Sequence, residues 1–267
     1  DSSTSRGLGD VYKRQGYIVA ITSVSHNIKF STSVPIAIFV GTLSGVVVGY
    51  IALQTKGVYF FMLTLAVTLG LYSFANQAQE ITRGHTGFNG IPHPIIFGLS
   101  FENVNLLYFL FLAIAILLFI ICKFLESTSF GIALRGVRDN EERMTSMGYR
   151  IMPLKIIAFV FSAFIASISG VMGVFYVTNI SPDSVGLLRS IDLLVIVVVG
   201  GATYLGGAFV GAALIAVFEA IIQDFTVYYV GATGILFIVV LLLAPQGLMG
   251  ISSQIRRNRA KVEGEAK

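Results

Sequence analysis

The chain alternates long apolar runs with short polar segments. Runs with few or no charges occupy residues 34–53, 57–76, 105–125, 155–178, 187–222 and 230–248. A membrane-spanning α-helix needs about 20 predominantly apolar residues. With a part-length run at 16–25, the pattern predicts an all-α, multi-pass membrane protein with about eight transmembrane segments and no soluble domain.

The run 187–222 differs from the others because it is interrupted by the sequence GGATYLGG at 200–207. It is long enough for two short or tilted helices, or for a re-entrant hairpin. In either arrangement the bend falls at the helix-turn glycines, which are Gly200, Gly201, Gly206 and Gly207. We expect a helix turn at the cytoplasmic surface.

Small residues recur along two of the apolar runs. They are Gly41, Ser44, Gly45 and Gly49 in the first run, and Ser162, Ala166, Ser169, Gly170 and Gly173 in the run 155–178. Small side chains let helix backbones approach closely in lipid. Both runs are therefore expected to pack tightly against neighbouring helices.

Composition places the chain in the membrane class. Of its 267 residues, 55% are hydrophobic and 12% charged, against about 25% charged in soluble domains; mean hydropathy is +0.83. The net charge of +4 does not indicate nucleic-acid binding, because the basic residues flank apolar runs. A single cysteine, Cys122, and the scattered His26, His85 and His93 indicate neither a disulfide nor a metal site.

The two ends of the chain differ from its middle. Residues 1–15 are polar and lack the apolar core of a signal peptide, so we expect a non-native leader on an N-terminally truncated fragment. Residues 16–250 form the predicted transmembrane domain. The polar tail at 251–267 is expected to be cytoplasmic.

One densely charged segment, residues 126–153, lies inside this apolar chain, and we call it the charged island. Its charges include Arg135, Arg138, Asp139, Glu141, Glu142, Arg143 and Arg150. Such a segment cannot lie in hydrocarbon, so it marks a place where the chain emerges into water. Lys and Arg gather on the cytoplasmic side of membranes, which places the island there and the loop 77–104 outside.

Within the island, residues 131–148 have the pattern of one short helix. Apolar positions alternate with charged ones, and Gly148 supplies the C-terminal stop. Two interpretations remain open at this point. The helix is either a solvated linker held against lipid headgroups or a surface on which a partner acts.

Catalytic motifs are absent from the sequence. It contains no Gly-x-x-x-x-Gly-Lys-Ser/Thr phosphate loop, and no Ser/His/Asp set or paired carboxylates occur in the spans. Asp192, Glu219 and Asp224 lie near predicted external helix ends, where an interfacial role outweighs a proton relay. These features favour a passive pathway moved by an external motor over an enzyme or an ion-coupled transporter.

Several motifs together resemble a known family. In the island they are Gly131, Ala133, Leu134, Arg138, Asn140, Glu141 and Gly148, followed by Lys155, Ala158, Phe159, Ser162, Ala163, Ala166 and Gly170. Three stretches follow the same pattern: TRGHTGFNGIP at 82–92, VVVGGATYLGGAFVGAAL at 197–214 and APQGLMG at 244–250. In order and spacing they resemble LivM-type permeases of the branched-chain amino acid ABC transporter family. Arg83, Ala208 and the Arg143–Met144 pair depart from the family pattern.

The resemblance implies a permease subunit of an ATP-driven importer in a bacterial or archaeal plasma membrane, with no cofactor of its own. Its expected partners are a second permease subunit in a heterodimer, two cytoplasmic ATPase subunits that bind ATP, and a periplasmic or extracellular substrate-binding protein. The expected ATPase-coupling residues are Gly131, Arg135, Arg138, Asp139, Asn140, Glu141 and Gly148. The expected substrate pathway includes Thr82, Gly84, Thr86, Gly87 and Gly90, whose alternative role is a flexible loop that docks the binding protein.

The substrate expected from the resemblance is a branched-chain or related hydrophobic amino acid. Permeases for urea or short-chain amides look much alike, so that substrate class is the first alternative. A stand-alone secondary transporter or channel is the alternative from a different class. Co-purification with an ATPase would distinguish an importer subunit from a stand-alone transporter or channel.

Overall fold

A computed structural model describes most of the helical chain in two compact units. The described residues are 30–55, 57–78, 88–89, 95–96, 99–100, 103–180 and 187–223, with single residues and pairs between 231 and 250. The first unit includes the described residues through Ser190, and the second begins at Ile191. The expected leader 1–15, the run 16–25 and the tail 251–267 lie outside the described residues, as does much of the run 230–248.

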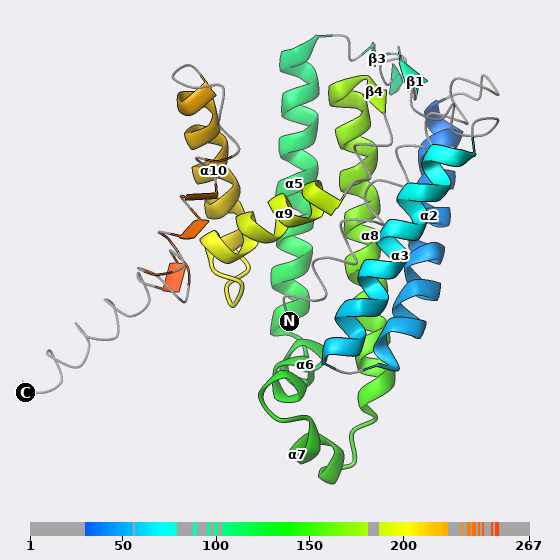
Figure 1. Cartoon of the computed structure of the whole chain (residues 1–267), viewed down its shortest axis with the longest axis vertical. Helices are drawn as coiled ribbons and strands as arrows, with labels where there is room; N and C mark the ends of the chain where they lie inside the picture. The colour runs from blue at the N-terminus through cyan, green and yellow to red at the C-terminus, as the bar shows by residue number, and fades with distance from the viewer. Residues whose placement is uncertain are drawn as a thin grey trace, which may run out of the picture. The chain divides into compact units, whose positions relative to one another are not determined.

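Long helices joined by a short helical segment make up the first unit (Figure 1). They are α2 (Phe30–Leu53), α3 (Val58–Gln77), α5 (Val104–Ser127), α6 (Ser129–Asp139), α7 (Glu141–Ser146) and α8 (Ile151–Val177). The predicted runs at 34–53, 57–76, 105–125 and 155–178 are confirmed as helices. Helix α8 begins at Ile151, ahead of Pro153. Proline is tolerated there because N–H groups in a first helical turn have no partner within the helix.

Three described helices are long and apolar enough to cross a membrane. They contain the stretches Thr32–Leu53, Val104–Ser127 and Ile151–Val177. Shorter apolar stretches occur at Val58–Phe74, Ser190–Gly200 and Gly207–Ile222. The helical membrane class is therefore confirmed, whereas the total of about eight segments stays a prediction.

Helices α2 and α8 form the most extensive contact between described elements. On α2 a buried stripe of small residues recurs every fourth position: Ser33, Ala37, Gly41, Gly45 and Gly49. Near the end of this stripe, Gly49 lies under the ring of Phe159, which is 3% exposed. A Cβ atom at position 49 would overlap that ring. The absence of a side chain therefore allows this close approach, as expected for packing in lipid.

The contact face of α8 differs from the predicted stripe by about one residue. Its buried positions are Phe159, Ala163, Ser167, Gly170, Val171, Val174 and Phe175. Of the small residues singled out from the sequence, Gly170 is buried and Ser169 is exposed. Small residues occur all round α8, so composition could not indicate which of them face a neighbouring helix. In the structure a large side chain, Phe159, lies on the contact face.

Hydroxyl groups inside these apolar helices bond to their own backbone. Ser167 donates to the carbonyl of Ala163 at 2.6 Å, and Thr68 donates to that of Thr64 at 2.8 Å. Thr64 in turn donates to the carbonyl of Phe60 at 3.0 Å. Such bonds satisfy a polar group without water. They explain how buried serine and threonine are tolerated in membrane helices.

Short strand pairs lie at the end of α8 opposite the island (Figure 1). Strand β1 (Phe88–Asn89), in the loop after α3, pairs antiparallel with β4 (Asn179–Ile180), which follows α8. A second pair joins β2 (Ile95–Ile96) to β3 (Leu99–Ser100). The 27-residue length of α8 separates this end from the island by about 40 Å. The β1–β4 pair and the island thus lie at opposite ends of one long apolar helix.

A helical hairpin lies mainly in the second unit. Helices α9 (Leu187–Gly200) and α10 (Gly207–Gln223) are joined at GGATYLGG, which confirms the predicted bend. With 14 and 17 residues, they are about 21 and 26 Å long, shorter than a hydrocarbon core of about 30 Å. Gly200 and Gly207 are in direct backbone contact where the helices meet.

The contact between Gly49 and Phe159 can be tested with one methyl group. Gly49→Ala places its Cβ against the ring, and we expect a loss of stability of about 1–3 kcal/mol, as for other overpacked sites. Gly70→Ala, in α3, is the matched control because no heavy atom lies within 4 Å of the added Cβ. The measurement is the thermal unfolding midpoint of each purified variant in detergent. Equal midpoints for Gly49→Ala and Gly70→Ala would contradict this packing.

Candidate functional site

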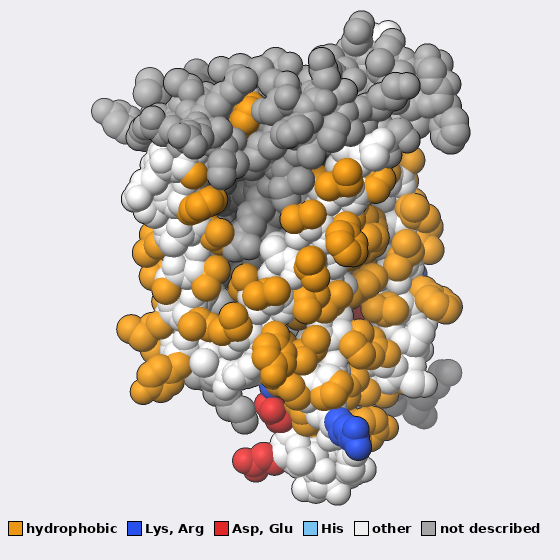
Figure 2. All heavy atoms as spheres, turned by 90° about the vertical axis from the view of Figure 1, so that its right-hand side faces the viewer, with side chains coloured by type: hydrophobic (Ala, Val, Ile, Leu, Met, Phe, Trp, Pro, Cys, Tyr) orange, Lys and Arg blue, Asp and Glu red, His pale blue; other side chains and the backbone are white. Residues whose placement is uncertain are grey.

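The charged island forms one end of the first unit. Helices α2 and α3 contain no charged residue, and α8 contains one, Lys155. Figure 2 shows hydrophobic side chains over much of the described face, with acidic and basic side chains at the end that carries α6 and α7. An apolar surface with a charged end matches a helix bundle whose connecting segment emerges into water.

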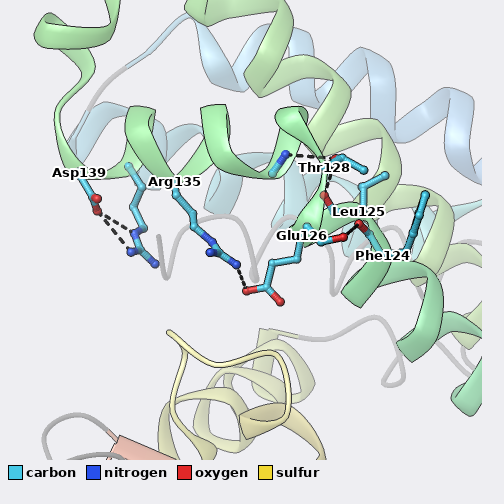
Figure 3. A network of polar contacts seen from close by, with 9 residues as sticks. Phe124, Leu125, Glu126, Thr128, Arg135 and Asp139 are labelled. Carbon is cyan, nitrogen blue, oxygen red and sulfur yellow. Dashed lines mark hydrogen bonds and ion pairs between the residues drawn. The ribbon is translucent and has the colours of Figure 1, made fainter. Parts of the chain in front are cut away.

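The island begins with a capped helix. The hydroxyl of Thr128 accepts from the backbone N–H of Gly131 at 3.5 Å and donates to the carbonyl of Leu125 at 2.6 Å (Figure 3). Helix α6 therefore begins at Ser129, before the predicted start at Gly131. Gly131 is buried at the turn from α5. A Cβ there would lie 2.6 Å from the carbonyl oxygens of Leu125 and Glu126.

The prediction of a single helix through the island is wrong, because the helix breaks at Asn140. The backbone of Asn140 is extended, with φ −160° and ψ 105°. Its side-chain oxygen accepts from the N–H of Arg143 at 2.8 Å, so Asn140 caps α7. Asparagine is among the preferred N-cap residues. Glu141 and Glu142 follow in the first turn of α7, where negative charge stabilises a helix.

Helix α7 ends at Ser146, and the predicted glycine, Gly148, terminates it two residues later. Gly148 has φ +86°, a conformation that residues with a side chain rarely adopt. Its N–H donates to the carbonyl of Thr145 at 2.9 Å, and the N–H of Tyr149 donates to that of Met144 at 3.2 Å. These two bonds form a Schellman motif, which fixes the direction in which the chain leaves towards α8.

Two ion pairs lie on the exposed surface of α6. Arg135 pairs with Glu126 at the end of α5, and the two side chains point towards each other in Figure 3. Arg138 pairs with its neighbour Asp139 at 3.3 Å. All four side chains are exposed, and exposed ion pairs contribute only about 0–1 kcal/mol each. These charges therefore add little stability and are accessible to a partner.

A third ion pair links the island to a membrane helix. The Lys155 ammonium, in the second turn of α8, donates to the Glu141 carboxylate in α7 at 2.8 Å. Both side chains are partly buried, with 30% of Lys155 and 37% of Glu141 exposed. This contact joins two elements that are separate in the sequence.

A cavity of about 680 Å³ lies beside this third pair. Its walls come from the α2–α3 turn, from α6 and α7, and from the beginning of α8. The lining residues are Leu53, Thr55, Gly57, Phe60, Leu134, Val137, Arg138, Asp139, Asn140, Glu141, Lys155, Ala158, Phe159 and Ser162. The structure thus brings together four of the predicted coupling residues, Arg138, Asp139, Asn140 and Glu141. Gly131, Arg135 and Gly148 lie outside the lining.

Exposed apolar side chains accompany the charges of the island. Ile132 is 64% exposed and Met147 is 61% exposed, and Tyr149, two residues after Met147, is exposed as well. Protein–protein contacts are enriched in aromatic residues, methionine and arginine, and the exposed surface of the island carries Tyr149, Met147 and Arg135. Among the described residues, no group of His, Cys, Asp and Glu is placed to hold a metal ion.

The other predicted site residues fall into two groups. Thr82, Gly84, Thr86, Gly87 and Gly90 all lie outside the described residues. Gly200, Gly201, Gly206 and Gly207 form the predicted turn, with Gly201 at φ +109°. Sequence analysis missed the Thr128 cap, although a threonine before a helix is a recognisable start signal. It also missed the Glu141–Lys155 pair, for which residues 14 apart give no local signal.

Comparison with known proteins identifies the family. The family model described as "Branched-chain amino acid transport system / permease component" matches residues 10–245. The chain belongs to this family. It is therefore a membrane transport component, which confirms the resemblance drawn from the motifs.

Individual relatives agree with this assignment. The high-affinity branched-chain amino acid transport system permease protein LivM of Salmonella typhimurium is 26% identical over 97% of this chain and 67% of its own length. A probable branched-chain amino acid transport permease protein, LivH, of Methanocaldococcus jannaschii is 27% identical over 82% of this chain and 74% of its own. The ribose import permease protein RbsC of Haemophilus influenzae is 24% identical over 75% of this chain and 61% of its own length. No solved structure shows a significant match.

The cap at Asn140 predicts how α7 responds to substitution. Asn140→Ala removes the acceptor for the Arg143 N–H, and we expect α7 to lose about 0.5–2 kcal/mol of local stability. Asn140→Asp keeps an acceptor oxygen and should behave like the original residue. Hydrogen exchange of residues 141–146 measures the difference. Unchanged exchange in Asn140→Ala would contradict the capping role.

Proposed function

We propose that this chain is the membrane-spanning permease subunit of an ATP-driven importer for branched-chain or similar hydrophobic amino acids. The observation that carries the proposal is the family match over residues 10–245. The position of the island between the long apolar helices α5 and α8 is consistent with a separate ATPase that acts on the island from outside the membrane. Since the sequence has no phosphate loop, ATP is bound and hydrolysed by a separate chain.

The proposed assembly contains more than this chain. A second permease subunit completes a heterodimer, two cytoplasmic ATPase subunits supply energy, and a periplasmic or extracellular binding protein delivers substrate. Residues 16–250 form the permease domain, with the island and the tail 251–267 on the cytoplasmic side of the plasma membrane. The concentration of Lys and Arg in these segments supports that orientation.

The island is the proposed docking surface for the ATPase. Arg135, Arg138 and Asp139 are exposed on α6 and suited to direct contact. Asn140, with Gly131 and Gly148, fixes the shape of this surface through the cap, the close turn from α5 and the end of α7. Closure of the ATPase dimer would move the island and tilt α5 and α8, which switches the pathway between outward-facing and inward-facing forms.

The proposed substrate follows from the relatives, and its proposed route follows from the glycine-rich segments. The LivM relative covers 97% of this chain, which favours a branched-chain amino acid over the sugar named for RbsC. The glycine-rich segment with Thr82, Gly84, Thr86, Gly87 and Gly90 is proposed to bring irregular backbone to the pathway mouth. Gly200, Gly201, Gly206 and Gly207 are proposed to turn the α9–α10 hairpin at the cytoplasmic surface.

Reversing one exposed charge tests the proposed function. Arg138→Glu should lower ATP-dependent leucine uptake at least about tenfold, since losing one partner of a charge pair buried in a contact costs about 2–5 kcal/mol. The measurement is uptake into proteoliposomes that contain the complete importer. Membrane insertion should be unaffected, because the side chain is exposed beyond α5 and α8.

Arg138→Lys is the matched control for this test. It keeps the positive charge and should retain most of the uptake. Wild-type uptake in Arg138→Glu would contradict docking at this residue. Transport by the chain alone, driven by an ion gradient without an ATPase, would contradict the function as a whole.

A further inference from the structure

The Glu141–Lys155 pair holds α7 against the only charged position of α8. Lys155 is the single charged residue in the 27 residues of α8. Lys155 lines the cavity, and its ammonium donates to the Glu141 carboxylate at 2.8 Å. A lysine near the end of an apolar helix commonly extends its charge to water. Here that charge is directed instead at an acidic residue of the island.

The same face of α8 also contacts α2. Phe159 lies one helical turn beyond Lys155 and packs over Gly49. Both Lys155 and Phe159 line the cavity, together with Leu53 at the end of α2. Glu141 is therefore linked to Gly49 by one ion pair, one turn of α8 from Lys155 to Phe159, and one packing contact. Contiguous packed contacts of this kind can carry energetic coupling between distant elements.

The two short helices of the island are held differently. Helix α6 is tied to the end of α5 by Arg135 and Glu126, whereas α7 is tied to α8 by Glu141 and Lys155. The extended backbone at Asn140 separates the two helices. Each half of the island is thus bonded to a different membrane helix. The pair on α7 is also the less exposed of the two.

We propose that Glu141 and Lys155 are positioning residues that transmit movement of α7 to the α2–α8 helix pair. In this role Glu141 acts through Lys155, whose ammonium lies 2.8 Å from its carboxylate. This inference rests on the proposed function, in which the island is moved by a partner. The alternative is that the pair only stabilises the fold. A purely stabilising pair would change the amount of folded complex and leave unchanged the number of substrate molecules imported per ATP hydrolysed.

A charge swap in the complete importer separates these alternatives. The variants are Glu141→Lys, Lys155→Glu and the double swap, with Lys155→Arg as the conservative control. ATPase co-purification, ATP hydrolysis and leucine uptake are measured on each. In the single variants we expect the ATPase to remain bound and to hydrolyse ATP, while uptake per ATP falls about tenfold. The double swap and Lys155→Arg should restore uptake per ATP to within about threefold of wild type.

Unchanged uptake per ATP in both single variants would overturn the proposal. A double swap whose uptake per ATP is no higher than that of the single variants would overturn it as well. Should Lys155→Glu fail to insert, Glu141→Gln provides the same test without an acidic residue in α8. The proposed function fails in a different way: the wild-type chain would bind no ATPase. Even then, hydrogen exchange of residues 141–146 tests the link. Faster exchange in Glu141→Gln, reversed in the double swap, supports the contact, and unchanged exchange refutes it.

Discussion

The close contact between α2 and α8 is the packing on which the first unit depends. Lipid tails are as apolar as the helix surfaces, so helices associate in a bilayer through close fit more than through the hydrophobic effect. The small-residue stripe of α2 supplies that fit, and Gly49 lies directly under the ring of Phe159. Helix α8 is thereby held to α2 along a face that continues to Lys155, the residue that contacts the island.

The charges of the first unit are segregated by a second constraint. Ionisable groups are costly in hydrocarbon, and α2, α3 and α8 together contain only Lys155. The island therefore carries the charged surface, and its shape comes from local bonds: a cap at Thr128, a break at Asn140 and a glycine stop at Gly148. An exposed surface of defined shape, bonded to α5 and α8, is suited to receive force from outside the membrane.

Much of this organisation was predictable from the sequence, and the exceptions have physical causes. Apolar runs located the helices, and the glycines at 200–207 located a bend, because both signals are local. The break at Asn140 was missed because its side chain bonds to the backbone of Arg143 and so ends one helix and begins another. The spacing of apolar residues does not reveal such a bond. The contact face of α8 and the Glu141–Lys155 pair depend on tertiary packing. The pathway residues from Thr82 to Gly90 remain predictions.

Cross-linking from the island tests the central claim most directly. Cys122 is the single cysteine of the chain, so Cys122→Ser removes the background and Glu142→Cys places one thiol on the exposed part of α7. In the complete importer, a bifunctional thiol reagent should join this position to an ATPase subunit, with a yield that changes between nucleotide-free and ATP-trapped states. Leu112→Cys, on an exposed apolar face of α5, should give no such product. An intact complex without a cross-link from position 142 in either state would contradict docking on the island.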